Sequence, residues 1–218
     1  GVYLGAQWSL SHGWTARAYT DYAYFAWPRY GLSFSSHVWD HLLEAEYRRG
    51  SVVWQTRYRL KRRQTDGADH SRLIDYATHR GQTSVAGQWG RVSTKSVVGV
   101  AYSAKGRGSL GWLVGQWLRY GTDRWQVSGS VAYFDTDDYE SRLYYYERGL
   151  LYTFGFPSYY GQGLHYAVSV RADLSRHVQA AVRAGTTNYM DRDHISSGLQ
   201  QIDRSSQTDV EMQLRLRF

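Results

Sequence analysis

The 218-residue sequence contains no cysteine and only two prolines. The lack of cysteine excludes disulfide scaffolds, thiolate catalysis and cysteine metal sites. There is also no run of about 18 consecutive apolar residues, which excludes transmembrane helices. The mean hydropathy of −0.57 leaves a membrane β-barrel open, because only every second residue of a barrel strand meets lipid. The sequence shows no signal-peptide pattern at its start, so for a secreted barrel we expect that one was removed or that this chain is not the whole gene product.

Aromatic residues and strand-like alternation are abundant instead. Tyrosine, tryptophan and phenylalanine make up 16% of the chain, and these side chains favour strands and membrane interfaces. The alternation is clearest from Thr208 to Phe218, where apolar residues occupy one face and polar residues the other. The two sets are Val210, Met212, Leu214, Leu216 and Phe218, and Glu211, Gln213, Arg215 and Arg217. This pattern predicts the closing strand of a transmembrane β-barrel, although an amphipathic strand of a soluble sandwich has the same period.

Short and long connections alternate along the rest of the chain. Short turns are expected at 10–13, 49–50, 92–94, 121–124, 148–149 and 174–176, with strands at 79–91, 95–104, 141–147 and 150–156 among others. Longer loops lie between them. Short turns at one end and long loops at the other are typical of bacterial outer-membrane barrels. The sequence therefore predicts one all-β domain over residues 1–218, an antiparallel up-and-down membrane barrel with about 13 strands visible.

Charges on neighbouring strands are complementary. In the hairpin expected over residues 39–61, a two-residue turn places Asp40 near Arg59 and Glu44 near Arg57, so we expect cross-strand ion pairs. Aromatic residues gather beside the short turns and predict an interfacial girdle at the periplasmic end. The girdle residues are Trp8, Trp14, Tyr47, Trp89, Tyr120, Trp125 and Phe218.

An odd strand number has a consequence for closure. With 13 strands, the first and the last run in the same direction, whereas single-chain bacterial barrels normally have an even number. We therefore expect this sequence to be the C-terminal part of a barrel with 14 or more strands, in a native polypeptide that extends upstream of Gly1.

Three motifs resemble one family. The segment Tyr139-Glu140-Ser141-Arg142-Leu143-Tyr144-Tyr145-Tyr146-Glu147 is followed by Pro157-Ser158-Tyr159-Tyr160-Gly161-Gln162-Gly163 and by the loop 191–198. These motifs resemble the C-terminal barrel of Bacteroidota envelope proteins with an N-terminal helix-hairpin-helix (ComEA-like) domain, over about the last 90 residues. The resemblance implies an outer-membrane location and a missing N-terminal part. The helix-hairpin-helix is not in this sequence, so no nucleic-acid partner is expected from it.

Enzyme motifs are weak. The acidic run of Asp135, Asp137, Asp138 and Glu140 has the composition of a cation site, but also of a solvated loop. Asp191, Asp193, His194, Ser196 and Ser197 have the residue types of a hydrolase at the barrel rim, but sequence neighbours rarely form a triad. The histidines lack metal-ligand spacing. We expect no enzyme activity, no cofactor and no metal.

The most informative functional feature is a set of charged residues expected on the inner face. The basic members are Arg17, Arg57, Arg59, Lys61, Arg119, Arg142, Arg171, Arg183, Arg215 and Arg217. The acidic members are Asp21, Asp40, Glu44, Glu46, Asp173 and Glu211. The basic set predicts a porin-like conduit for anionic solutes or polyanions. The alternative is a plugged, structural or accessory barrel in which the charges pair. Expected partners are membrane lipid, lipopolysaccharide and other outer-membrane or periplasmic proteins.

Overall fold

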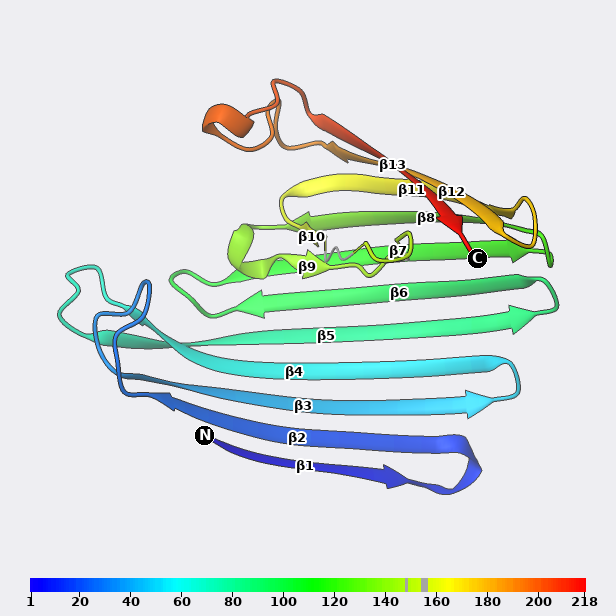
Figure 1. The fold of residues 1–218 in the computed structure, drawn as a ribbon. Helices are drawn as coiled ribbons and strands as arrows, with labels where there is room; N and C mark the ends of the chain where they lie inside the picture. The colour runs from blue at the N-terminus through cyan, green and yellow to red at the C-terminus, as the bar shows by residue number, and fades with distance from the viewer. Residues whose placement is uncertain (148, 154–156) are drawn as a thin grey trace.

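The fold is a single curved antiparallel sheet. A computed structural model describes residues 1–147, 149–153 and 157–218, and its large sheet contains eleven strands in sequence order, with β1 and β13 at the two edges (Figure 1). The strands are β1 (Val2–Ser9), β2 (Trp14–Phe25), β3 (Ser36–Arg49), β4 (Val52–Asp66), β5 (Leu73–Trp89), β6 (Val92–Ser103), β7 (Ser109–Gly121), β8 (Trp125–Thr136), β11 (Gln162–Asp173), β12 (Val178–Tyr189) and β13 (Ser206–Leu216). The all-β, up-and-down antiparallel prediction is confirmed. The sheet is open, because β1 and β13 do not pair with each other.

The connections of the large sheet separate by length. Those at 10–13, 50–51, 90–91, 122–124 and 174–177 are short and lie at one end of the strands, whereas the longer ones lie at the other end (Figure 1). Two of the turns contain only two residues and begin with Gly50 and Gly90, whose positive φ angles of 57° and 56° suit tight hairpins. The predicted asymmetry is therefore present, with one turn at 90–91 rather than 92–94.

Helices contribute little to this fold. The described residues contain 3₁₀ turns at η1 (Ser11–Gly13), η2 (Tyr139–Ser141) and η3 (Gly198–Gln200). None of the helical segments in the described part of the chain has the length and apolar character needed to cross a membrane.

The predicted hairpin over residues 141–156 is wrong, as is the count of about 13 strands in the large sheet. Only β9 (Leu143–Tyr144) is a strand in the first half, and it pairs with β10 (Ser158–Tyr159) in a separate two-stranded sheet. Residues 149–153 form no strand, and residues 148 and 154–156 of the predicted turn and strand lie outside the described residues. The strand predicted at 79–91 begins earlier, at Leu73. With eleven strands, the count remains odd.

The connection between β8 and β11, residues 137–161, is here called the inner loop. It lies in front of β6–β8, inside the curve of the sheet (Figure 1). Its Leu143, Tyr145 and Tyr159 are buried against apolar residues of the sheet and form the hydrophobic core with them. The sheet residues of this core are Val97, Ala101, Leu113, Ala132 and Phe134. The face of the sheet that the inner loop covers is therefore the concave one.

Small residues on β6 and β7 make room for the inner loop. A Cβ atom added at Gly111 would lie 2.6 Å from the backbone oxygen of Ser141, and one at Gly115 would lie 2.5 Å from the Tyr145 ring. Gly99 faces Leu143 in the same way, at 3.4 Å. The absence of side chains at these positions lets the loop pack directly on the backbone of the sheet.

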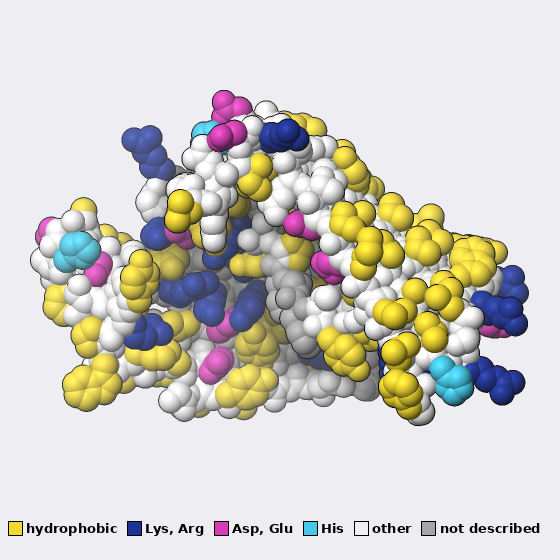
Figure 2. All heavy atoms as spheres, turned by 45° about the horizontal axis from the view of Figure 1, so that its top comes forward, with side chains coloured by type: hydrophobic (Ala, Val, Ile, Leu, Met, Phe, Trp, Pro, Cys, Tyr) yellow, Lys and Arg dark blue, Asp and Glu magenta, His cyan; other side chains and the backbone are white. Residues whose placement is uncertain are grey.

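The convex face is apolar and exposed. Large hydrophobic side chains project from its strands, with few charges between them. Figure 2 shows part of this apolar surface in yellow, to the right of the hollow. Among them are Leu4, Trp39, Leu43, Val98, Val114, Leu118, Val168, Val182, Met212 and Leu214. Polar residues on this face satisfy one another: Gln116 bonds Ser96 at 2.6 Å and Thr94 at 2.5 Å. An apolar surface of this extent is unusual for a protein surrounded by water.

Aromatic side chains form two belts on the convex face. On β2, β3, β7 and β8, a tryptophan and a tyrosine stand eight residues apart: Trp14 and Tyr22, Trp39 and Tyr47, Trp112 and Tyr120, Trp125 and Tyr133. Their rings meet across strands on both belts, for example Trp14 with Tyr47 at 4.8 Å and Tyr22 with Trp39 at 4.6 Å. Eight residues span about 27 Å along a strand, which at a strand tilt of about 40° is about 20 Å along the membrane normal. This is slightly less than the apolar band of about 25 Å in membrane barrels.

The predicted girdle residues all lie at the short-turn end. Trp8, Trp14, Tyr47, Trp89, Tyr120 and Trp125 occupy outward-facing positions beside the short turns, and Phe218 follows β13 there and is fully exposed. The belt at the long-loop end was not anticipated. It was recognisable in the sequence from the repeated spacing of eight between tryptophan and tyrosine.

Candidate functional site

Charged side chains line the concave face of β2–β4. Glu44 accepts bonds from Arg17 at 2.6 Å and from Arg57 at 2.7 Å, and its carboxylate is almost fully buried. Asp40 accepts a bond from the Arg59 Nε at 2.8 Å. Both ion pairs predicted from the hairpin are present. They form because the two-residue turn at Gly50 sets a register in which β3 and β4 point these side chains to the same side.

The remaining predicted acids have different neighbours. Lys61 lies 3.5 Å from Asp40, and Glu46 pairs with Arg48 at 3.2 Å. Asp173 accepts a bond from Gln179 at 2.6 Å. Asp21 stands opposite Asp40 in the strand register and faces the same cavity as Lys61. Acidic residues therefore neutralise part of the predicted basic set on the concave face of β2–β4.

Other predicted basic residues contact neutral groups. Arg119 donates to Ser93 at 2.9 Å, and Arg171 donates to Gln126 at 3.1 Å. Arg215 stands opposite Gln179 on β12, and Arg217 follows the end of β13, where its backbone meets His177. These residues are spread around the concave face and its short-turn end, so the structure does not gather the predicted set into one site.

Arg142 belongs to the inner loop and not to a barrel strand, which corrects its predicted place. It follows η2, donates to the backbone oxygen of Tyr139 at 2.8 Å and donates to the Tyr144 hydroxyl at 3.2 Å. Its guanidinium therefore enters the concave space from the loop side, facing the wall of β4 and β5.

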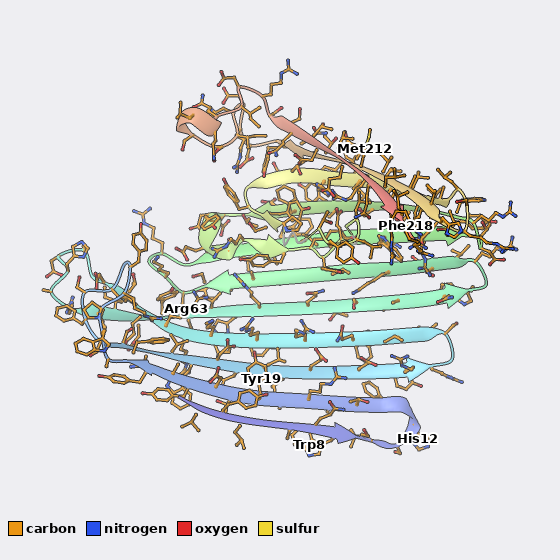
Figure 3. All side chains as sticks on the ribbon, in the orientation of Figure 1. Trp8, His12, Tyr19, Arg63, Met212 and Phe218 are labelled. Carbon is orange, nitrogen blue, oxygen red and sulfur yellow. The ribbon has the colours of Figure 1, made fainter. Side chains whose placement is uncertain are left out.

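Two arginines of that wall were missed by the sequence prediction. Arg63 on β4 continues the alternation of Arg57, Arg59 and Lys61, and Arg80 on β5 stands opposite Arg59. The Nε atoms of Arg63 and Arg80 are both buried and have no hydrogen-bond partner in the described part of the chain. The signal for Arg63 was the unbroken period of two beyond Lys61. Arg63 is labelled in Figure 3.

The Arg80 guanidinium lies 5.0 Å from the centre of the Tyr144 ring, and Arg142 donates to the hydroxyl of the same ring. Arg63, Arg80 and Arg142 are here called the arginine cluster. Positive charge gathers inside the hollow of the molecule in Figure 2. No carboxylate of the described residues lies within ion-pair distance of the cluster's guanidinium groups, unlike those of Arg17, Arg57 and Arg59.

A buried carboxylate holds the middle of the inner loop. Glu147 accepts bonds from Ser130 at 2.6 Å and from Arg183 at 2.6 Å, and it lies 3.1 Å from the Nε2 of His165. The three partners come from β8, β12 and β11. Arg183 also contacts Glu211 on β13 at 3.4 Å. The predicted basic residue Arg183 therefore serves as a partner of the loop.

The charge of Glu147 is stabilised despite its burial. Burial by itself raises the pKa of a carboxyl group, but hydrogen bonds from His165, Ser130 and Arg183 outweigh it and lower the pKa to about 2. Glu147 is therefore ionised at all ordinary pH values. Its Arg183 partner connects the inner loop to the sheet by a buried ion pair.

The two weak enzyme motifs are placed as follows. Asp137 accepts a bond from the Leu110 backbone, Asp138 accepts one from Ser109 and Glu140 pairs with Lys105, so these acids fix the start of the inner loop. Asp135 lies on β8 near Gln162. Among the described residues no group of three His, Asp or Glu side chains is arranged to hold a metal ion.

The Asp193–His194 pair is exposed at the long-loop end. Asp193 Oδ1 lies 2.7 Å from His194 Nδ1, and the two side chains are 97% and 59% exposed. Within the described residues, neither Ser196 nor Ser197 hydrogen-bonds to His194. Asp191 pairs with Arg192 at 2.7 Å. The pair therefore lies at the surface, and the hydrogen bonds of the described residues connect no serine to it.

The concave space contains several cavities, and the inner loop lines two of the three described here. One cavity of about 650 Å³ lies toward the long loops and is lined in part by Asp40, Lys61, Arg63 and Tyr76. A second of about 740 Å³ lies toward the short turns. A third of about 820 Å³ lies between the loop and β11–β13, where Glu147 is found. Of the arginine cluster, Arg63 lines the first of these cavities, and Arg80 and Arg142 contact Tyr144 of the inner loop.

Comparison with protein-family models found no match to this chain. Comparison with curated proteins also found no relative. The resemblance to helix-hairpin-helix envelope proteins therefore stays a prediction.

Proposed function

We propose that this chain forms most of an integral outer-membrane β-barrel and that its concave face lines a conduit for anionic solutes. The observation that carries the membrane part is the division of the sheet. The convex face is apolar between two aromatic belts, and the charges lie on the concave face. Charged side chains are costly in lipid and tolerated in a wet lumen. Lipid and lipopolysaccharide are then the partners of the convex face.

Closure requires more strands than the eleven described. An antiparallel barrel closes with an even number of strands, and β1 and β13 are the open edges of an odd set. We propose that one further strand, or another odd number, pairs with these edges. An upstream part of the same polypeptide, as in the family that the sequence resembles, is the source we favour.

The conduit is supported by the balance of charge on the concave face. Acidic partners neutralise Arg17, Arg57 and Arg59, but the arginine cluster has none in the described residues. The concave surface therefore has excess positive charge next to an open cavity, an arrangement that favours anions.

Planar-bilayer recording under a salt gradient tests the conduit. We expect heat-modifiable migration of the complete protein in detergent gels and ion channels whose reversal potential shows a preference for anions. Correctly folded protein without any conductance would contradict the conduit. A monomer that stays soluble without detergent would contradict the membrane barrel.

The accessory-subunit alternative rests on the inner loop. This loop reaches from β6 to β13, where Gln213 donates to the backbone oxygen of Leu151 at 2.6 Å. It narrows the concave space from one side to the other. A closed lumen would show no channels in the bilayer experiment, so the same recording separates the two functions.

A single arginine on the convex face tests the membrane placement. Leu43 is 60% exposed and lies midway between Trp39 and Tyr47. In lipid, Leu43→Arg is expected to lower the free energy of unfolding by about 2–4 kcal/mol. In water the same change at an exposed position is expected to cost less than about 0.5 kcal/mol.

Gln55→Arg, on the concave face of the neighbouring strand, is the matched control. We expect it to cost less than about 0.5 kcal/mol, because the added charge faces a wet space next to Glu46. Urea unfolding of the protein in lipid vesicles measures both. Equal effects of the two substitutions would contradict a lipid-facing convex surface.

A further inference from the structure

The arginine cluster brings together groups from three segments. Arg63 lies on β4, Arg80 on β5 and Arg142 on the inner loop, and Tyr144 contacts both Arg80 and Arg142. Arg63 and Arg142 are close enough to act electrostatically on Arg80. Like charges repel at this range, so the arrangement is costly unless an anion occupies it.

The donors of the cluster are available to a ligand. A guanidinium has five N–H donors, and within the described residues Arg142 donates to the Tyr139 oxygen and to the Tyr144 hydroxyl. The buried Nε atoms of Arg63 and Arg80 have no partner among the described residues. Buried donors without protein partners are rare in folded proteins, and binding of an anion is one ordinary reason for them.

The pKa of Tyr144 reflects the positive electrostatic potential around the arginine cluster. Burial raises the pKa of a phenol, but the hydrogen bond from Arg142 and the charges of Arg142 and Arg80 outweigh it, so the pKa of Tyr144 is lowered. An anionic oxygen is therefore stabilised where the wall meets the inner loop.

We propose that the arginine cluster binds the phosphate group of a small phosphorylated solute. The paired N–H groups of an arginine guanidinium can donate to two oxygens of one phosphate. Three guanidinium groups that approach from different directions suit a group with several charged oxygens. Arg63 connects the cluster to a cavity of about 650 Å³ that Lys61, Asp21 and Asp40 also line, and this cavity has the size of a small-molecule site. Because the inner loop covers the concave face of β6–β8, a small solute is favoured over a long polyanion.

This proposal rests on the conduit proposed above and adds the solute's chemical class and its binding point. Inorganic phosphate is the probe. Isothermal titration calorimetry of the complete protein in detergent, at constant ionic strength, measures binding without requiring conductance. We expect Arg63→Gln and Arg80→Gln each to weaken phosphate binding about tenfold or more, because each removes a charge-assisted bond.

Arg142→Gln is a third variant, which changes the inner loop and leaves the strands β4 and β5 unchanged. It is expected to weaken binding by a similar factor. Arg176→Gln, in the short turn at 174–177, removes the same charge outside the concave face and is expected to leave binding unchanged. Heat-modifiable migration verifies folding of each variant.

The outcomes separate the two proposals. Channels with anion preference but phosphate binding that is absent, or unaffected by the three variants, would overturn the phosphate site and leave the conduit. Phosphate binding that depends on the cluster, in a protein without channels, would overturn the conduit and support the site. Binding of a single-stranded oligonucleotide in place of phosphate would overturn the assignment to a small solute.

Discussion

Replacing Glu147 with glutamine is expected to release the inner loop and to lower the free energy of unfolding by about 3–5 kcal/mol, because one partner of a buried ion pair is removed. Arg183 and His165 would then remain buried without the carboxylate that they share. Urea unfolding of the protein in detergent or lipid measures the loss. Limited proteolysis is expected to cut the loop faster in the variant.

Glu211→Gln is the matched control, since it removes the other carboxylate of Arg183. The Glu211 side chain is 37% exposed and its oxygen lies 3.4 Å from Arg183, so we expect a cost of about 1 kcal/mol or less. If both variants lost the same stability, Glu147 would not be the group that holds the loop.

The Glu147 contribution also has a defined pH dependence. Its pKa is lowered from 4.5 to about 2 in the folded protein, so the unfolded chain takes up the proton first. The stabilisation is complete above pH 4.5 and is lost as the pH falls from there to about 2. Glu147→Gln is expected to flatten the stability profile in that window. An unchanged slope would contradict the assigned ionisation.

Gly111→Val is expected to displace the inner loop from β7, with a loss of about 1–3 kcal/mol typical of overpacking. The new side chain would meet the backbone of Ser141, which has no rotamer that relieves the clash. In bilayer recordings the displaced loop is expected to increase single-channel conductance, because it no longer narrows the concave space.

Gly81→Val on the convex face provides the comparison. No atom lies within 4 Å of a Cβ built at Gly81, so unfolding free energy and conductance are expected to stay near those of the wild type. Unchanged conductance in Gly111→Val, with its stability lowered, would show that the inner loop does not restrict the conduit.

The sequence by itself determined the strands whose partners are neighbours along the chain. Alternation placed Val210, Met212 and Leu214 on one face of β13, and the turn at Gly50 set the register that pairs Glu44 with Arg57. Both depend on local geometry, since a period of two defines a face and a two-residue turn defines a register. The separation of short turns from long loops was predictable for the same reason.

Only the tertiary structure decided the arrangement of residues 141–147. Leu143 and Tyr145 alternate with Tyr144 and Tyr146 as in a barrel strand, but they pack on the glycines of β6 and β7. Alternation cannot distinguish a barrel strand from an extended loop segment that packs on the sheet, because both bury one side of the segment. The choice depends on contacts with residues far away in the sequence, and the same is true of the arginine cluster, whose members are brought together by three separate segments.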